Sequence, residues 1–191
     1  MRKISSKYEE EKKRKKNTLI IGIILIFVML ASVFGIIVNS FGSKNTKSKI
    51  EYNGYEFENQ NGLWITSKAN FIWGFVYSPY EVENISTNSM IKSFALYQNS
   101  PLYVLSDDKD SEVEIYRNFA QVAERMQTAC LNDEKCEGNF PVKTCSDNFI
   151  IIKESETQEI KQQENCVYIQ GKKEDLVKLT DAFLYKSIGV R

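Results

Sequence analysis

Residues Leu19–Val38 read LIIGIILIFVMLASVFGIIV, and this run decides how the rest of the chain is organised. It contains no charged side chain, and 15 of its 20 residues are Ile, Leu, Val or Phe. A helix of about 20 such residues spans the hydrocarbon core of a bilayer, and its side chains favour insertion. The run therefore predicts a transmembrane helix over residues 18–38, with residues 19–38 in contact with the lipid bilayer.

Two other interpretations of this run are weaker. A core helix of a globular protein usually keeps one polar face, which this run lacks. A cleavable signal peptide stays open because Ala31 and Ser32 lie near the far end, although the apolar stretch and its charged lead are both long for one. Ala31 and Gly35 also form a small-xxx-small pair, through which two copies of the helix would pack as a homo-oligomer.

Charge is distributed unevenly around the apolar run. Residues 1–17 hold eight basic and three acidic side chains, whereas residues 39–191 hold 17 basic and 22 acidic ones. Basic flanks stay on the cytoplasmic side of a membrane. We therefore predict a basic cytoplasmic tail over 1–17, a flexible stalk over 39–49, and an exported domain over 50–191. The protein is expected in the cell membrane as a single-pass protein with its C-terminal domain outside the cytoplasm.

The composition excludes several classes of function. The chain has no histidine, so a Ser-His-Asp triad, a His-ligated zinc or haem and a histidine pH switch are all excluded. The net charge of zero argues against a nucleic-acid-binding protein. We expect no cofactor, because no phosphate-binding glycine loop and no metal-ligand spacing is present.

The exported domain alternates strand and helix patterns, which predicts an α/β or α+β fold with helices on one face of a mixed sheet. Nine aromatic residues between Tyr52 and Tyr80 are expected to form the core of a small sheet rather than a sugar-stacking surface. The expected strands are Ile50–Phe57, Leu63–Thr66, Asn70–Tyr77, Met90–Tyr97, Pro101–Ser106, Phe149–Lys153 and Cys166–Gln170. The expected helices are Pro79–Ile85, Ser111–Cys130 and Lys173–Ile188.

Four cysteines, Cys130, Cys136, Cys145 and Cys166, lie in the predicted exported domain. An even number there predicts two disulfides, and we favour Cys130–Cys136 with Cys145–Cys166 among the three possible connectivities. A thiol nucleophile lacks a histidine base, a redox pair would favour Cys-x-x-Cys, and the spacings do not fit a zinc ribbon. Structural disulfides are therefore the preferred interpretation.

Two further motifs have weaker chemical interpretations. Residues Asp107–Glu112 resemble a calcium loop but lack its glycine and its closing glutamate, so a turn that complements a helix dipole is favoured. Asn84-Ile85-Ser86 is a glycosylation sequon that would lie on the exported side.

Three stretches carry a resemblance to a known group: NFPVKTCSDNFIII (139–152), NCVYIQG (165–171) and LTDAFLYKSIGV (179–190). Together with the single N-terminal span, they resemble uncharacterised archaeal single-pass membrane proteins with a cysteine-containing exported domain. The resemblance implies an exported setting and no particular chemistry.

We therefore expect a membrane-anchored binding protein at the cell envelope, whose partner is an envelope protein or a glycan. One alternative is an envelope enzyme, either a carboxylate hydrolase or a thiol oxidoreductase. Another is a pilin-like subunit that assembles through its apolar helix. The sequence shows no catalytic motif, so the binding role is preferred to the enzyme.

Overall fold

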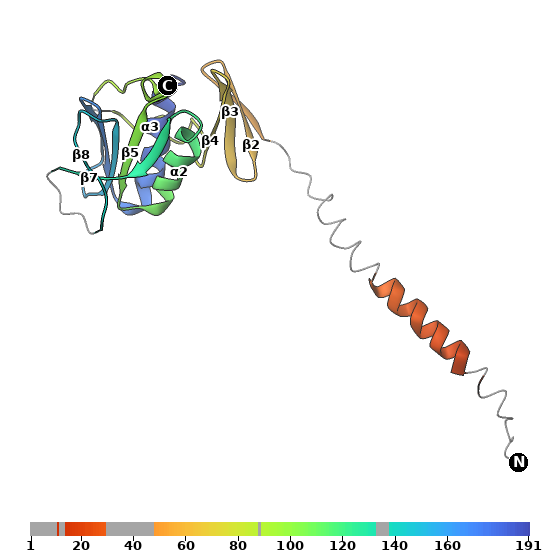
Figure 1. Cartoon of the computed structure of the whole chain (residues 1–191). Helices are drawn as coiled ribbons and strands as arrows, with labels where there is room; N and C mark the ends of the chain where they lie inside the picture. Colours follow the sequence, from red (N-terminus) through yellow and green to blue (C-terminus); the bar gives the residue numbers. More distant parts are fainter. Residues whose placement is uncertain (1–10, 12–13, 30–47, 88, 133–137) are drawn as a thin grey trace, which may run out of the picture. The chain divides into compact units, whose positions relative to one another are not determined.

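The structure is a computed structural model of the chain, and it describes residues 11, 14–29, 48–87, 89–132 and 138–191 (Figure 1). The chain divides into two compact units, Met1–Thr46 and Lys47–Arg191. In the first unit, residues 14–29 are helical. Within the described residues no helix has both the length and the apolar character needed to cross a bilayer. The predicted span continues through residues 30–38, which lie outside the described residues.

The second unit begins with a four-stranded antiparallel sheet, the meander, in the order β1-β2-β3-β4. Two-residue turns at Asn53-Gly54, Asn61-Gly62 and Ala69-Asn70 join the strands, and all six turn residues have positive φ, as right-twisted hairpins require. The first of these turns divides the predicted strand Ile50–Phe57 into two strands. The strands are β1 (Lys49–Tyr52), β2 (Tyr55–Gln60), β3 (Leu63–Lys68) and β4 (Phe71–Phe75).

A second sheet of five strands has the order β10-β11-β9-β5-β6. Strands β11, β9, β5 and β6 are parallel, and only β10 runs antiparallel to its neighbour. The central strands are apolar along their length because both faces of the sheet are covered. The strands are β5 (Pro101–Ser106), β6 (Arg125–Thr128), β9 (Phe149–Glu154), β10 (Glu159–Gln163) and β11 (Cys166–Gly171).

Two helices, α2 (Lys109–Phe119) and α3 (Leu176–Ser187), lie between the two sheets (Figure 1). Helix α3 is buried almost all round, and its Tyr185 ring stacks on Phe75 of the meander at 4.0 Å. Phe57, Trp73 and Phe75 are fully buried, which confirms that these aromatic side chains form a sheet core. The mixed α+β fold is therefore as predicted, with both helices on one face of the mixed sheet.

The connection from β6 to β9 covers the other face of the mixed sheet. It contains β7 (Cys130–Leu131) and β8 (Val142–Lys143), which pair with each other. The chain passes outward from β5 through α2 to β6, and then returns past β5 to β9. Because both crossovers between parallel strands are right-handed, they must lie on opposite faces of the sheet. Tyr103, Ala129, Phe149 and Ile151 form the smaller core on this side.

The largest error in the predicted elements is the helix Ser111–Cys130. Helix α2 ends at Phe119, and residues Arg125–Thr128 form β6, which pairs in parallel with β5. The helix cap is Asp108 and not Ser111, because the Asp108 carboxylate accepts a hydrogen bond from the Ser111 amide. The second half of the predicted helix becomes a strand because pairing with a buried neighbour outweighs local propensity.

Three smaller corrections concern other segments. The predicted strand Met90–Tyr97 is wrong, since it contains the 3₁₀ helix η1 (Phe94–Tyr97). The predicted helix Pro79–Ile85 is instead a series of turns, although Ser78 and Glu81 do form reciprocal capping bonds. The sequence pattern predicts no strand over the residues of β10. The C-terminal helix is confirmed, preceded by η2 (Lys173–Asp175) and followed by Gly189 at positive φ.

Candidate functional site

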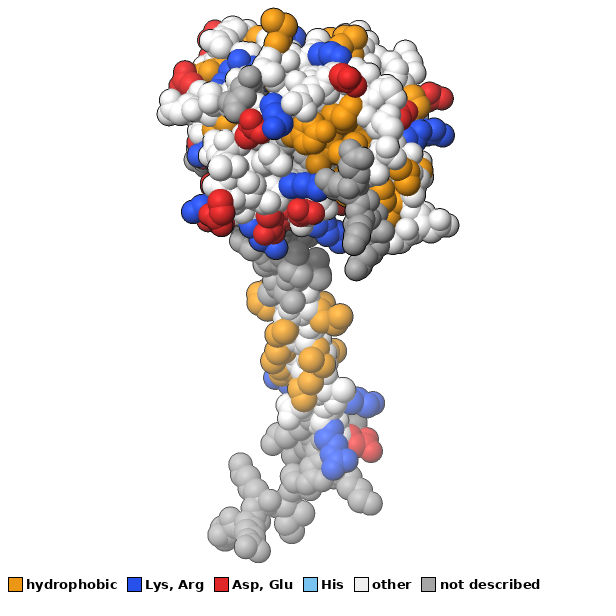
Figure 2. All heavy atoms as spheres, turned by 90° about the vertical axis from the view of Figure 1, so that its left-hand side faces the viewer, with side chains coloured by type: hydrophobic (Ala, Val, Ile, Leu, Met, Phe, Trp, Pro, Cys, Tyr) orange, Lys and Arg blue, Asp and Glu red, His pale blue; other side chains and the backbone are white. Residues whose placement is uncertain are grey.

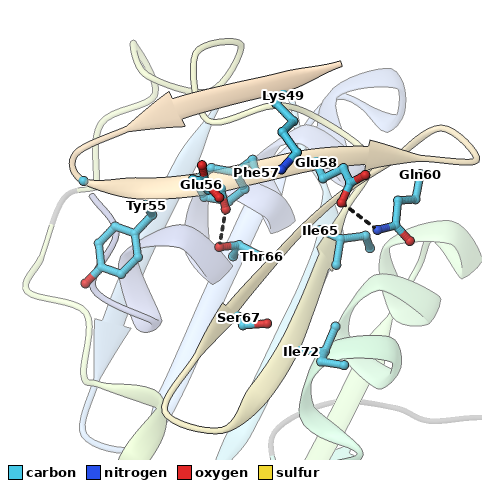
Figure 3. Close-up of a pocket in the computed structure, with 11 residues that line it drawn as sticks. Lys49, Tyr55, Glu56, Phe57, Glu58, Gln60, Ile65, Thr66, Ser67 and Ile72 are labelled. Atoms are coloured by element: carbon cyan, nitrogen blue, oxygen red, sulfur yellow. Dashed lines mark hydrogen bonds between the residues drawn. The ribbon is translucent and has the colours of Figure 1, made fainter. Parts of the chain in front are cut away.

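A groove of about 570 Å³ lies on the meander (Figure 3). Successive side chains of a strand point to opposite faces of the sheet. Because Phe57, Trp73 and Phe75 are buried on the inner face, the side chains between them in β2 and β4 lie on the outer face, together with their register partners in β3. The outer-face residues that line the groove include Glu56, Glu58, Gln60, Ile65, Ser67 and Ile72.

The groove combines an apolar floor with acidic side chains. The Ile72 side chain is 64% exposed, and Ile65 lies on the same face of the neighbouring strand. Gly74 faces Ile65 across the strand pair, and an added Cβ there would lie only 3.0 Å from the Ile65 Cδ1. The glycine therefore leaves the space that the Ile65 side chain occupies.

Polar groups gather at one end of the groove. Glu58 is paired in register with Lys49, and its Oε2 accepts a hydrogen bond of 3.2 Å from the Gln60 Nε2. Figure 3 draws these three side chains close together, with Glu56 farther along the same strand. The arrangement supplies hydrogen-bond acceptors beside exposed apolar surface, which suits the binding of a ligand.

The free edge of β4 is covered by one side chain of α2 and one from the segment that follows it. The Asn118 amide donates to the Gly74 carbonyl at 2.8 Å and accepts from its N–H at 2.9 Å. Gln121, two residues after the end of α2, makes the equivalent pair of bonds with Ile72. These side-chain amides bind the backbone groups of the β4 edge as a neighbouring strand would. They therefore fix the edge of the sheet that carries the groove and prevent this edge from pairing with another strand.

Beside this edge lie two buried carboxylates, Glu114 and Asp181, that the sequence did not reveal. Asp181 accepts a hydrogen bond of 2.8 Å from the Tyr77 amide, and Glu114 forms an ion pair with Arg117. Burial is the main cause that raises the pKa of each carboxyl group, and the charge of Glu114 raises that of Asp181 further. Both side chains are at most 1% exposed, so no substrate reaches them as the structure stands.

The structure tests part of the cysteine prediction. Cys145 and Cys166 form a disulfide, as predicted, and it ties the segment before β9 to the start of β11. Cys130 is also disulfide-bonded. Its predicted partner, Cys136, lies outside the described residues, so that pairing stays a prediction.

The remaining predicted site residues lie apart from the groove. Asn84 is exposed in a turn, a setting that suits a glycosylation acceptor. In the acidic segment before α2, Asp108 is occupied as the helix cap and binds both the amide and the hydroxyl of Ser111. The described part of the chain contains no group of three or more His, Cys, Asp or Glu side chains that could hold a metal.

Comparison of the chain with protein family models, with curated proteins and with solved structures finds no match.

Proposed function

We propose that this protein is a single-pass membrane protein whose C-terminal domain lies outside the cytoplasm and binds a partner at the cell envelope. The apolar run Leu19–Val38 is the support for the anchor. In its described part, the residues from Leu19 to Met29 are helical and carry no charge, which suits a helix surrounded by lipid.

The orientation rests on charge and on the disulfide. The eight basic residues before the apolar run favour a cytoplasmic N-terminus. A disulfide such as Cys145–Cys166 persists in oxidising compartments and is rare in the cytosol. Both observations favour an exported position for the domain.

The groove on the meander is the proposed contact surface, and a cationic extended peptide segment of a neighbouring protein is the proposed partner. Glu56 and Glu58 are acidic groups of this face, and residues 39–191 carry five more acidic than basic side chains. An extended segment with both basic and apolar side chains on one face, at every second residue, would place its cations on the glutamates and an apolar side chain over Ile72. The groove is the single observation that carries this binding role.

Membrane insertion is tested by fractionation and labelling of the full chain. The protein should stay in the membrane pellet after an alkaline carbonate wash and be released by detergent. A cysteine introduced by Met90→Cys, at a position 92% exposed, should react with an impermeant maleimide on intact cells. One introduced by Ser5→Cys should react only after permeabilisation, and the reverse pattern would overturn the proposed orientation.

The contact surface is tested with a synthetic peptide that carries lysine, lysine and valine at successive alternate positions with serine between them, titrated into full-length protein in neutral detergent. We expect binding that weakens as salt is added, because the attraction is between exposed charges. The double change Glu56→Lys and Glu58→Lys should abolish it, whereas Glu124→Lys, an exposed charge reversal outside the groove, should not. An equal loss of peptide binding in both variants would show that only net charge matters, and it would refute the groove as the binding site.

A further inference from the structure

A second cluster of polar side chains lies on the opposite side of the domain, on the face of the mixed sheet away from the helices. Tyr103 of β5 is 2% exposed, and its ring packs against Phe149 with a centroid separation of 6.3 Å. Arg125 of β6 donates from Nη2 to the Tyr103 hydroxyl at 3.1 Å. The Lys143 ammonium, from β8, lies 4.4 Å from the Tyr103 ring centroid.

Three separate segments thus bring two cations to one phenol. The nearby Lys143 ammonium is the largest cause that lowers the pKa of Tyr103, and Arg125 lowers it further. The same contact raises the pKa of Lys143. Asp147 balances one of the two charges, since its Oδ1 lies 3.4 Å from the Lys143 Nζ. A net positive charge remains around the hydroxyl.

The guanidinium of Arg125 is the part of this cluster that reaches solvent. The residue is exposed, and no carboxylate among the described residues forms an ion pair with it. A guanidinium has five N–H donors in a planar fork, and Tyr103 uses one of them. The remaining donors are free to bind both oxygens of a carboxylate or phosphate group.

The disulfide holds the third member of the cluster in place. Lys143 precedes Cys145 by two residues, and Cys145 is bonded to Cys166 at the first residue of β11. The Asn165 amide also donates to the Cys145 carbonyl at 3.1 Å. Figure 2 shows the side of the domain where β7 and β8 lie, with basic, acidic and apolar side chains interspersed.

We propose that Tyr103, Arg125 and Lys143 form a binding site for a single oxyanion group, either a phosphate or a carboxylate. Arg125 would bind two oxygens with its outward donors, Lys143 would supply the second positive charge, and the buried Tyr103 hydroxyl would hold the Arg125 guanidinium in position. This site is independent of the proposed peptide groove, because its residues lie on the other sheet and on its far face. Failure of one proposal leaves the other unaffected.

The test uses the full-length protein in neutral detergent and measures affinity by calorimetry. The probes are inorganic phosphate, acetate, and a short-chain phosphatidylglycerol below its micelle concentration. Binding of a soluble anion supports a small-molecule ligand, and binding of the phosphatidylglycerol alone supports a lipid headgroup. Binding of none of the three overturns the proposal.

Variants assign the binding to the three residues. Arg125→Met and Lys143→Met should each weaken the affinity about tenfold or more, since each removes a charge-assisted contact. Lys161→Met is the matched control, because Lys161 also lies over a tyrosine ring, 5.7 Å from that of Tyr168, without a second cation on its hydroxyl. An equal loss in the control, or no loss in the other two, contradicts the site.

A third variant separates binding from folding. Tyr103→Phe keeps the buried ring and removes only the hydroxyl, so the thermal midpoint should stay close to that of the wild type while the anion affinity falls. The near-ultraviolet absorbance of tyrosinate gives a second readout, as the difference between wild type and Tyr103→Phe reports the ionisation of Tyr103. A bound anion should raise the pH of that ionisation, and an unchanged titration with saturating anion would overturn the proposal.

Discussion

The change Asp181→Asn should stabilise the folded domain at neutral pH, although it alters a fully buried residue. Asp181 Oδ2 accepts the Tyr77 N–H, while its Oδ1 and the Glu114 Oε2 have no hydrogen-bond partner among the described residues. The neutral asparagine amide keeps one oxygen that accepts from the Tyr77 N–H. In place of Oδ1, which in a carboxylate can only accept, it has an NH₂ group that can donate. It also removes a charge that burial and Glu114 disfavour.

The expected size follows from the contacts that change. A buried polar atom without a partner costs about 1–3 kcal/mol, so the free energy of unfolding at pH 7 should rise by about that amount. For a domain of this size, each kcal/mol raises the thermal midpoint by about 2–4 °C. Asp181→Ala is the contrasting variant: it leaves the Tyr77 amide without an acceptor and should be destabilised by about 1–3 kcal/mol.

The pH dependence gives the sharper assay. The pKa of Asp181 lies well above its ordinary value of 3.8, so the folded state binds the proton more tightly than the unfolded chain. The stability that this proton binding contributes is fully present below pH 3.8, the ordinary pKa of the group. It is lost as the pH rises through the raised pKa of the folded state. Urea unfolding between about pH 4 and 8 should therefore show a smaller fall in stability for Asp181→Asn than for the wild type. A parallel fall in both proteins, or a less stable variant at pH 7, refutes the reasoning.

Three other perturbations test the packing. Asn118→Ala leaves a buried strand edge without its amide partner and should cost about 2–4 kcal/mol in urea unfolding, whereas Gln121→Ala, at an exposed position, should cost less than about 1 kcal/mol. Gly171→Ala places a Cβ 2.5 Å from a buried leucine methyl of α3, so we expect a loss of about 1–3 kcal/mol in the same assay, and an unchanged midpoint would contradict the packing. Replacing both Cys145 and Cys166 by Ala should cost about 3 kcal/mol, and reduction of the wild type should cost at least as much, because it also breaks the disulfide of Cys130.

Elements with strong local signals were predicted well. Phe149–Lys153 and Cys166–Gln170 are runs of apolar, β-prone residues, and they form β9 and β11 nearly as predicted. The Asn61-Gly62 turn and the stop at Gly189 follow from the low cost of positive φ for glycine. The Asn53-Gly54 turn carries the same signal, but the aromatic residues on both sides make the segment resemble one continuous strand.

Elements that depend on distant partners were predicted poorly. Residues 120–130 continue a helical spacing of apolar side chains, yet Arg125–Thr128 pair with β5, which lies about 24 residues earlier in the sequence. The edge strand β10 is polar on its exposed side, and it forms because β11 offers it a partner.

The candidate sites, too, depend on residues that are distant in the sequence. Glu114 and Asp181 are ordinary helix residues in the sequence, and only the packing of α2 against α3 and the β4 edge makes them a buried pair. The three residues of the proposed anion site are likewise separated by 22 and 18 positions, and no motif links them.

The amino-acid sequence by itself determined the apolar run, the uneven charge around it, the Asn61-Gly62 hairpin turn and the cysteine pair Cys145–Cys166 that forms a disulfide. Each of these depends on neighbouring residues or on a bond that only one residue type can make. The tertiary structure alone decided which segments became parallel strands, which carboxylates lost their water, and which cations surround Tyr103. These outcomes depend on burial and on charges brought together by the fold, and neither quantity exists until residues far apart in the chain come into contact.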